Sequence, residues 1–150
     1  MTATDPIVAT PIVATPIVAT PVADTAAERP VLAIADVAAQ TGVTAHTLRY
    51  YERIGLVTVP RDAAGRRRYG PEEVGRVVFI TRLRMTAMPI RDIQAYFRLV
   101  DAGHGNEAQR LALLERHRAE VMARLDELQS ALVAVDYKIS LYRDAATPGC

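Results

Sequence analysis

Hydrophobic residues recur at spacings of three and four along most of the chain after residue 30, which predicts a mainly helical protein. The longest such pattern covers residues 106–143, where steps of three and four alternate without a slip. Nine of its ten positions are apolar or aromatic, as in the seam of a coiled coil. These ten positions form the predicted dimer interface: Leu111, Leu114, Arg118, Val121, Leu125, Leu128, Leu132, Val135, Ile139 and Tyr142.

A helix over residues 106–143 would be roughly 50 Å long, more than the small domain before it can cover. Burial of each apolar side chain contributes about 1.5 to 3 kcal/mol, so the uncovered stripe predicts a homodimer. Arg118 interrupts the seam: it either meets Glu120 or Glu127 of the second chain and fixes the register, or extends its charge to the edge. The pattern does not choose between parallel and antiparallel pairing.

Four shorter helices are predicted in residues 31–103. One begins near Ile34 and ends at the turn Thr41-Gly42-Val43. The next has Thr44 at its N-cap and Gly55 just beyond its end, with Leu48 and Tyr51 on its inner face. A third starts at Pro71 and reaches about Met85, and a fourth opens at Pro89 and ends before Gly103. The last two are expected to bury the back of the first two.

Two short helices joined through a glycine turn form a helix-turn-helix. After them, residues 56–61 and 67–69 flank the turn at residues 62–65, which predicts two short strands and a loop, a wing. The expected fold class is therefore mainly α: a winged helix-turn-helix domain over residues 31–103, followed by a coiled-coil dimerisation helix over residues 106–143.

The exposed side chains of the second helix and the wing suit duplex DNA. Arginines reach phosphates or guanine edges, and threonine and tyrosine hydroxyls reach phosphate oxygens. The predicted DNA-binding residues are Thr44, His46, Thr47, Arg49, Tyr50, Arg53, Arg61, Arg66, Arg67, Arg68 and Tyr69. A two-fold dimer carrying two such surfaces predicts a palindromic operator.

The distribution of charge supports this interpretation, although the net charge of the chain is only +1. Residues 31–105 hold 11 arginines against 7 acidic residues and carry +4, whereas residues 1–30 carry −2 and residues 106–150 carry −1. Positive charge is therefore concentrated in the segment with the DNA-binding pattern.

The ordered set Thr44, Thr47-Leu48-Arg49-Tyr50-Tyr51-Glu52, Gly55-Leu56, Pro60, Arg61, Gly65, Arg67 and Tyr69 resembles the DNA-binding domain of the MerR family of bacterial transcription regulators. The resemblance covers about residues 31 to 103. Arg66 departs from it, because the family usually has an aromatic residue after the wing glycine. The resemblance implies antiparallel dimer helices, and a dimer that bends and untwists promoter DNA so that RNA polymerase can engage it.

The resemblance is to compact family members without an appended ligand domain, because only residues 144–150 follow the long helix. Metal-sensing members carry cysteines around the dimer helix, and here the only cysteine is Cys150, so no metal or cofactor is expected. The inducer, the promoter and the sign of regulation stay open. The alternative is an architectural or phage-type accessory protein that bends DNA and senses nothing.

The two ends of the chain are expected to lie outside the fold. Residues 1–30 repeat Pro-Ile-Val-Ala-Thr with a proline every five residues, which predicts disorder, and residues 144–150 are expected to form a flexible tail. A single cysteine and the lack of an 18-residue apolar run predict a cytoplasmic protein with no membrane span. With no phosphate-binding glycine loop and no paired nucleophile and base, an enzyme is not expected.

Overall fold

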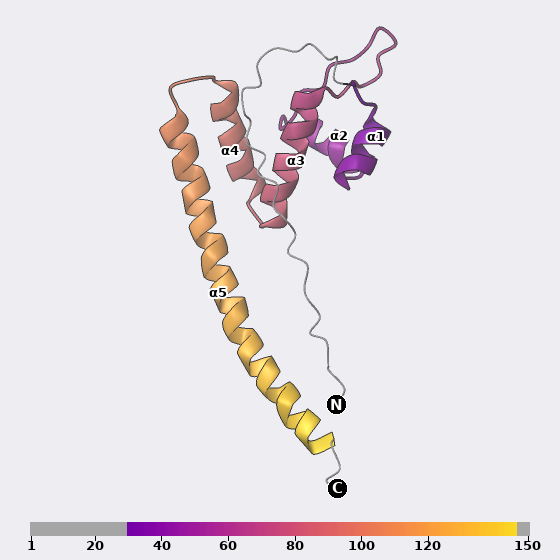
Figure 1. Cartoon of the computed structure of the whole chain (residues 1–150). Helices are drawn as coiled ribbons and strands as arrows, with labels where there is room; N and C mark the ends of the chain where they lie inside the picture. The colour runs from indigo at the N-terminus through magenta and orange to yellow at the C-terminus, as the bar shows by residue number, and fades with distance from the viewer. Residues whose placement is uncertain (1–29, 147–150) are drawn as a thin grey trace.

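The computed structural model describes residues 30–146, and helices dominate this part of the chain. They are α1 (Ile34–Thr41), α2 (Ala45–Arg53), α3 (Pro71–Met85), α4 (Ile90–Asp101) and α5 (Glu107–Ala146). Helices α1 to α4 gather into one lobe, while α5 runs alongside α4 and then extends far beyond the lobe (Figure 1). The predicted fold class is confirmed. The tails predicted to be disordered or flexible lie outside the described residues, except for Pro30 and residues 144–146.

The ends of α1 and α2 follow local signals in the sequence. Helix α1 ends at Gly42, whose φ of 70° is the left-handed conformation that glycine adopts readily. Helix α2 begins at Thr44, whose Oγ1 accepts a hydrogen bond of 3.1 Å from the Thr47 amide. It ends at Arg53, and Gly55, two residues later, has the left-handed φ of 76°, while the Leu56 amide donates to the Tyr51 carbonyl at 2.9 Å. The predicted cap and terminating glycine of α2 are both confirmed.

The turn between α3 and α4 has an unusual backbone. Ala87 has a φ of 62°, at the position after a helix where glycine is the common residue. For alanine this conformation costs roughly 1 to 2 kcal/mol. The amide of Met88 donates to the Leu83 carbonyl at 3.0 Å, and the Met88 side chain is buried. Burial of Met88 therefore holds a strained turn in place.

The wing is less regular than the sequence predicted. Between residues 30 and 146 the antiparallel pairing consists of two isolated bridges, Leu32 with Tyr69 and Arg61 with Arg67, and not of strands at 56–61 and 67–69. Pro60 has no amide proton to donate, although its carbonyl accepts from Arg68 at 2.8 Å. The loop then closes within a few residues at Asp62, so a longer ladder does not form.

The core of the lobe lies where α1, α2, α3 and α4 meet the base of the wing. Its largest fully buried side chains are Val37, Leu48, Leu56, Tyr69, Val77, Ile80, Met88 and Ile93. These residues come from all four helices, from the α3–α4 turn and from both sides of the wing. The wing is thus part of the lobe and not an appendage.

Arg76 of α3 joins three segments at the edge of this core. Its Nε donates to the Leu56 carbonyl, and its two terminal nitrogens reach the carboxylate of Asp101 at 2.5 and 2.8 Å. Its guanidinium lies 4.2 Å from the centre of the Phe97 ring. Hydrogen bonding to Arg76 lowers the pKa of Asp101. One side chain therefore ties α3 to α4 and to the chain that leaves α2.

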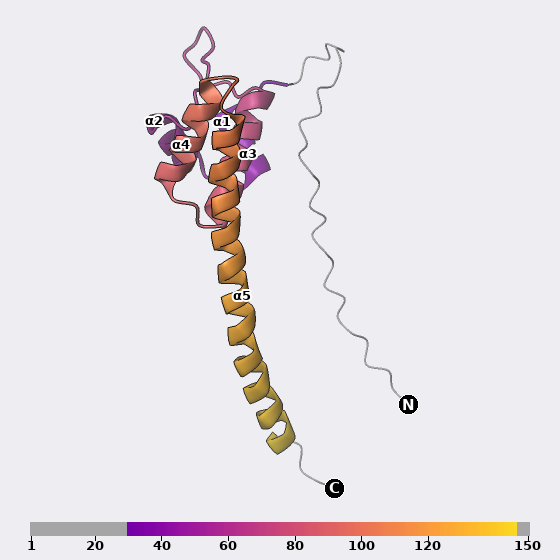
Figure 2. The same ribbon diagram turned by 90° about the vertical axis from the view of Figure 1, so that its left-hand side faces the viewer.

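Helix α5 reaches Ala146, three residues beyond the predicted end of the helix at 143. Residues 144–146 were placed in the flexible tail, and this is corrected. The reason is local, because Asp144-Ala145-Ala146 contains no helix breaker and the first proline after it is Pro148. Figure 2 shows the helix passing the lobe over its first turns and continuing as a single rod. No helix within residues 30–146 has the length and apolar character needed to span a membrane.

Candidate nucleic-acid interface

Helix α2 presents one face to the core and another to solvent. Leu48 and Tyr51 are buried, as predicted, and His46, Arg49 and Arg53 are exposed. The Arg53 guanidinium lies 5.5 Å from the centre of the Tyr50 ring, so charge and aromatic surface are adjacent on the outer face. This face carries the residue types that contact phosphates and base edges.

The two threonines at the start of α2 are bonded to each other. Their hydroxyl oxygens lie 2.9 Å apart, and Thr44 also caps the helix through the Thr47 amide. The primary role of Thr44 is therefore to begin the helix. The cap fixes the first turn of α2, which carries His46, and so helps to orient Arg49 on the turn that follows.

Asp62 organises the tip of the wing. Its Oδ1 accepts from the amides of Ala64 and Arg66 at 3.0 and 2.9 Å, and its Oδ2 accepts from the side chains of Arg66 and Arg68 at 3.1 and 3.0 Å. These bonds, led by that from the Arg66 amide, lower the pKa of Asp62. One carboxylate thus shapes the loop and holds two arginines beside it.

Glu52 joins α2 to the wing. Its Oε2 accepts from Arg67 Nε at 2.5 Å, and its Oε1 lies 3.6 Å from Arg61. The sequence places Glu52 in the motif of α2 but does not predict its pairing with Arg67, because the two residues are 15 positions apart and no local pattern pairs them. The ion pair makes the helix and the wing one continuous surface.

The combined surface of α2 and the wing is positively charged. Six arginines share it with the two carboxylates just described: Arg49, Arg53, Arg61, Arg66, Arg67 and Arg68. The carboxylates contact the wing arginines and leave a net charge of +4 over the surface. We call this set of residues the arginine surface. Positive charge gathered on one helix and loop is the electrostatic pattern of a DNA-binding module.

Tyr69 does not belong to this surface, which corrects the prediction that it binds DNA. Its side chain is fully buried, and burial raises the pKa of its hydroxyl. The hydroxyl has no hydrogen-bond partner among the described residues. The sequence placed Tyr69 with the wing arginines, but the bridge to Leu32 turns it into the core. Tyr69 therefore anchors the wing to the core of the lobe.

Replacing Tyr69 with Phe is expected to leave operator affinity unchanged and to keep or raise the free energy of unfolding by about 1 kcal/mol, because a buried unpaired hydroxyl is removed. Fluorescence anisotropy with a labelled operator and denaturant unfolding measure the two quantities. A fall in affinity of tenfold or more would show that Tyr69 does contribute to DNA binding.

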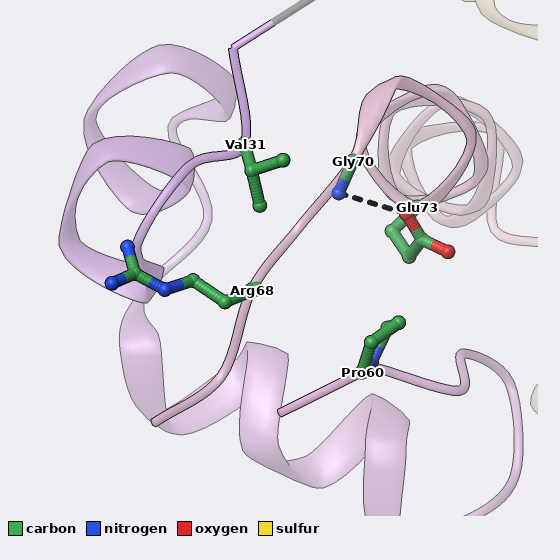
Figure 3. Close-up of a pocket in the computed structure, with 5 residues that line it drawn as sticks. All are labelled: Val31, Pro60, Arg68, Gly70 and Glu73. Atoms are coloured by element: carbon green, nitrogen blue, oxygen red, sulfur yellow. Dashed lines mark hydrogen bonds between the residues drawn. The ribbon is translucent and has the colours of Figure 1, made fainter. Parts of the chain in front are cut away.

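A recess of about 450 Å³ lies at the base of the wing, lined by Val31, Pro60, Arg68, Gly70 and Glu73 (Figure 3). Its charged groups are already bonded within the chain. Arg68 donates to Asp62, and Glu73 accepts from the Gly70 amide at 2.8 Å. The recess is therefore assigned to the support of the wing and not to a ligand. Within residues 30–146, no group of three or more His, Cys, Asp or Glu is placed to hold a metal ion.

The predicted dimer seam divides into two parts on α5. Leu114 is half-buried against the lobe's own core, because the first turns of α5 pack along α4. Its place in the dimer interface stays a prediction. Val121 is half-buried and Arg118 is exposed. The other members are exposed large apolar side chains, namely Leu111, Leu125, Leu128, Leu132, Val135, Ile139 and Tyr142. Met122, Val133, Tyr137 and Leu141 are also exposed, on positions outside the predicted seam.

This architecture, a helix-turn-helix lobe with a wing, an arginine surface and a long exposed rod, defines a DNA-binding protein. Two family models match it: the MerR HTH family regulatory protein over residues 32–99, and the MerR DNA-binding model over residues 74–136. The chain belongs to the MerR family of transcription regulators. This family is one of regulators and not of enzymes.

Relatives and solved structures agree with this membership. An uncharacterised HTH-type transcriptional regulator of Haemophilus influenzae is 30% identical over 116 residues, which cover 77% of this chain and 86% of that protein. The mercuric resistance operon regulatory protein of Pseudomonas fluorescens is 34% identical, over 68% of this chain and 74% of that one.

Two crystal structures have the same fold. HiNmlR, a MerR family regulator lacking the sensor domain and bound to promoter DNA, is 29% identical with a TM-score of 0.72, over 77% of this chain and 89% of that one. A MerR family regulator from Bacillus thuringiensis is 26% identical with a TM-score of 0.68, over 75% of this chain and all of that one.

Proposed function

We propose that the chain acts as a homodimer that binds a palindromic operator in a promoter and regulates transcription by distorting the DNA. The observation that carries this proposal is the arginine surface, in which Glu52 joins the exposed face of α2 to the wing. A surface of this kind contacts bases from the helix and backbone phosphates from the wing. The similarity to HiNmlR, a structure bound to promoter DNA, supports the same type of target.

The homodimer is supported by the rod. Seven apolar or aromatic members of the predicted seam are exposed on α5, and a monomeric protein rarely leaves so long an apolar stripe uncovered. Near the lobe the stripe enters a groove of about 190 Å³, lined by Met85, Thr86, Val121, Arg124, Leu125 and Leu128. A second copy of α5 would cover both the stripe and the groove. Antiparallel pairing, which the family resemblance implies, would place the two lobes at opposite ends of the pair.

Promoter distortion follows from two lobes held on one rigid pair of helices. Smooth bending of a DNA site of about 20 to 30 base pairs costs roughly 1 to 6 kcal/mol, which phosphate contacts from both arginine surfaces can offset. The bent and untwisted promoter would then present both of its elements to RNA polymerase. The architectural alternative, a protein that bends DNA without controlling transcription, differs in one readout: it leaves transcription in a reconstituted assay unchanged.

The experiment that tests the proposal is selection of bound fragments from genomic DNA by the full chain, followed by transcription from a promoter that contains the selected site. The expected result is an inverted repeat within a promoter and a change in transcript level. A folded chain that binds no DNA of any sequence at low ionic strength would contradict the proposal.

Replacing Arg49 with Ala is expected to weaken operator binding about tenfold, because one contact to a phosphate or a guanine edge is lost. The dimer should persist. Fluorescence anisotropy over a series of salt concentrations gives the affinity and its salt dependence. If Arg49 contacts a phosphate, the slope of log affinity against log salt falls by about one.

Arg98 provides the matched control for Arg49. It is an exposed arginine on α4, outside the arginine surface, so Arg98→Ala removes the same charge from a different place. The Arg98 variant should bind within about twofold of the natural chain. Equal losses in the two variants would mean that total charge, and not position on α2, controls binding.

A further inference from the structure

His117 of α5 is buried where the rod leaves the lobe. Its exposed fraction is 9%, although it belongs to a helix in which residues 122–146 are all exposed. Its Nε2 lies 2.7 Å from Oγ1 of Thr86, the residue that caps the end of α3. Leu114 packs against the lobe one turn earlier, and Val121 is half-buried one turn later. His117 is thus at the centre of the junction between the rod and the lobe.

The Thr86 hydroxyl contacts a backbone carbonyl as well as His117. The Thr86 hydroxyl lies 2.9 Å from the Leu83 carbonyl, to which it can only donate. When the hydroxyl donates to Leu83, its oxygen accepts from Nε2–H of His117, which is one of the two directions that the contact allows. In the neutral ring Nδ1 then carries no proton, and this buried atom has no hydrogen-bond partner among the described residues. The nearest carboxylate oxygen recorded for it, on Glu120, is 3.9 Å away.

Thr86 belongs to the strained turn between α3 and α4. The next residue, Ala87, has the φ of 62° described above, and Met88 after it is buried. Arg84 also donates to the Met88 carbonyl, at 2.7 Å. A turn with an unfavourable backbone conformation keeps its shape only when its surroundings fix it. His117 therefore connects the rod to a turn whose backbone conformation depends on its contacts.

We propose that His117 is a positioning residue which, through Thr86, fixes the angle between α5 and the DNA-binding lobe and so sets the separation of the two lobes in the homodimer. This inference rests on the proposed function, because only a dimer has two lobes to place. Because α5 is long, a small change of angle at His117 becomes a large displacement further along the helix. From His117 to Leu132 the helix rises roughly 22 Å, so a tilt of about 10° at the junction displaces the middle of the seam by roughly 4 Å relative to the lobe.

The test measures the separation of the lobes directly in the full chain. A spin label is attached at Ala39→Cys, an exposed position on α1, in a chain that also carries Cys150→Ser. Pulsed electron paramagnetic resonance then gives the distance between the two labels of a dimer. Thr86→Val and His117→Leu each remove the hydrogen bond, and Thr86→Ser keeps the hydroxyl as the matched control.

We expect Thr86→Val and His117→Leu to shift the distance distribution by several ångströms or to broaden it roughly twofold. Thr86→Ser should reproduce the distribution of the labelled parent, which a role in packing the Thr86 methyl group alone would not predict. Sedimentation and far-UV circular dichroism confirm that the variants are folded dimers.

Three results would overturn the inference. The same distribution in the parent, Thr86→Val and His117→Leu would show that the hydrogen bond does not set the angle, and would leave the proposed function intact. Unfolding of both variants would show that the contact maintains the lobe. A labelled parent chain with no measurable distance between labels would remove the homodimer, and with it both proposals.

Discussion

Replacing Leu132 with Asp is expected to leave the chain monomeric at micromolar concentration and to lower operator affinity by about a hundredfold or more. Leu132 is exposed in the single chain and lies in the middle of the rod's apolar stripe. In a homodimer the substitution would bury a carboxylate from each chain in an apolar seam, where an unpaired charge is strongly unfavourable. Sedimentation equilibrium reports the dimer, and anisotropy with an operator fragment reports the affinity.

The affinity falls with the dimer because two linked lobes bind two half-sites as one unit. Once the first lobe is bound, the second meets its half-site at a high effective concentration, and a monomer loses this gain. Ala134→Asp is the matched control: it introduces the same charge on the same turn of α5, about 200° around the helix from Leu132. That variant should remain a dimer. A Leu132→Asp chain that still sediments as a dimer would disprove the seam.

Replacing Arg76 with Ala is expected to lower the free energy of unfolding of the lobe by about 3 kcal/mol. The substitution leaves the Leu56 carbonyl without its donor, frees the Asp101 carboxylate and uncovers the Phe97 ring. Because Asp101 is more than half exposed, most of the loss comes from the Leu56 bond and the packing on Phe97. Denaturant unfolding at a fixed chain concentration measures the change.

Two variants test the explanation for Arg76. Arg76→Lys keeps the charge but loses the planar fork that reaches Leu56 and Asp101 together, so it should recover only part of the stability. Arg91→Ala removes an arginine that is 85% exposed and pairs only loosely with Asp92, at 3.6 Å, and it should cost less than about 0.5 kcal/mol. Comparable losses for Arg76→Ala and Arg91→Ala would contradict the assignment.

Much of the fold could be predicted from the sequence because its signals are local. Thr44, Gly42 and Gly55 each act on the backbone of their own turn, and the structure places the ends of α1 and α2 at these residues. The same holds for Pro71 at the start of α3. The inner face of α2 was also predicted correctly, because Leu48 and Tyr51 are spaced as neighbours on a helix.

What the sequence could not provide were contacts between residues far apart in the chain. Glu52 meets Arg67, Arg76 meets Asp101, and His117 meets Thr86, over separations of 15, 25 and 31 residues. No periodic pattern encodes such pairs, since each depends on how the helices cross. The prediction that Tyr69 binds DNA failed for the same reason, because Tyr69 turns inward at its bridge to Leu32.

The ion pair between Glu52 and Arg67 bears on how the family member could acquire a new operator. The pair fixes the wing to the inner edge of α2, whereas His46 and Arg49 are exposed on its outer face. In the proposed complex, substitutions at the outer positions would alter which bases are recognised while the wing keeps its position relative to the phosphates. On this proposal, a new operator could be acquired by a few substitutions in one helix, without change to the scaffold that positions the wing.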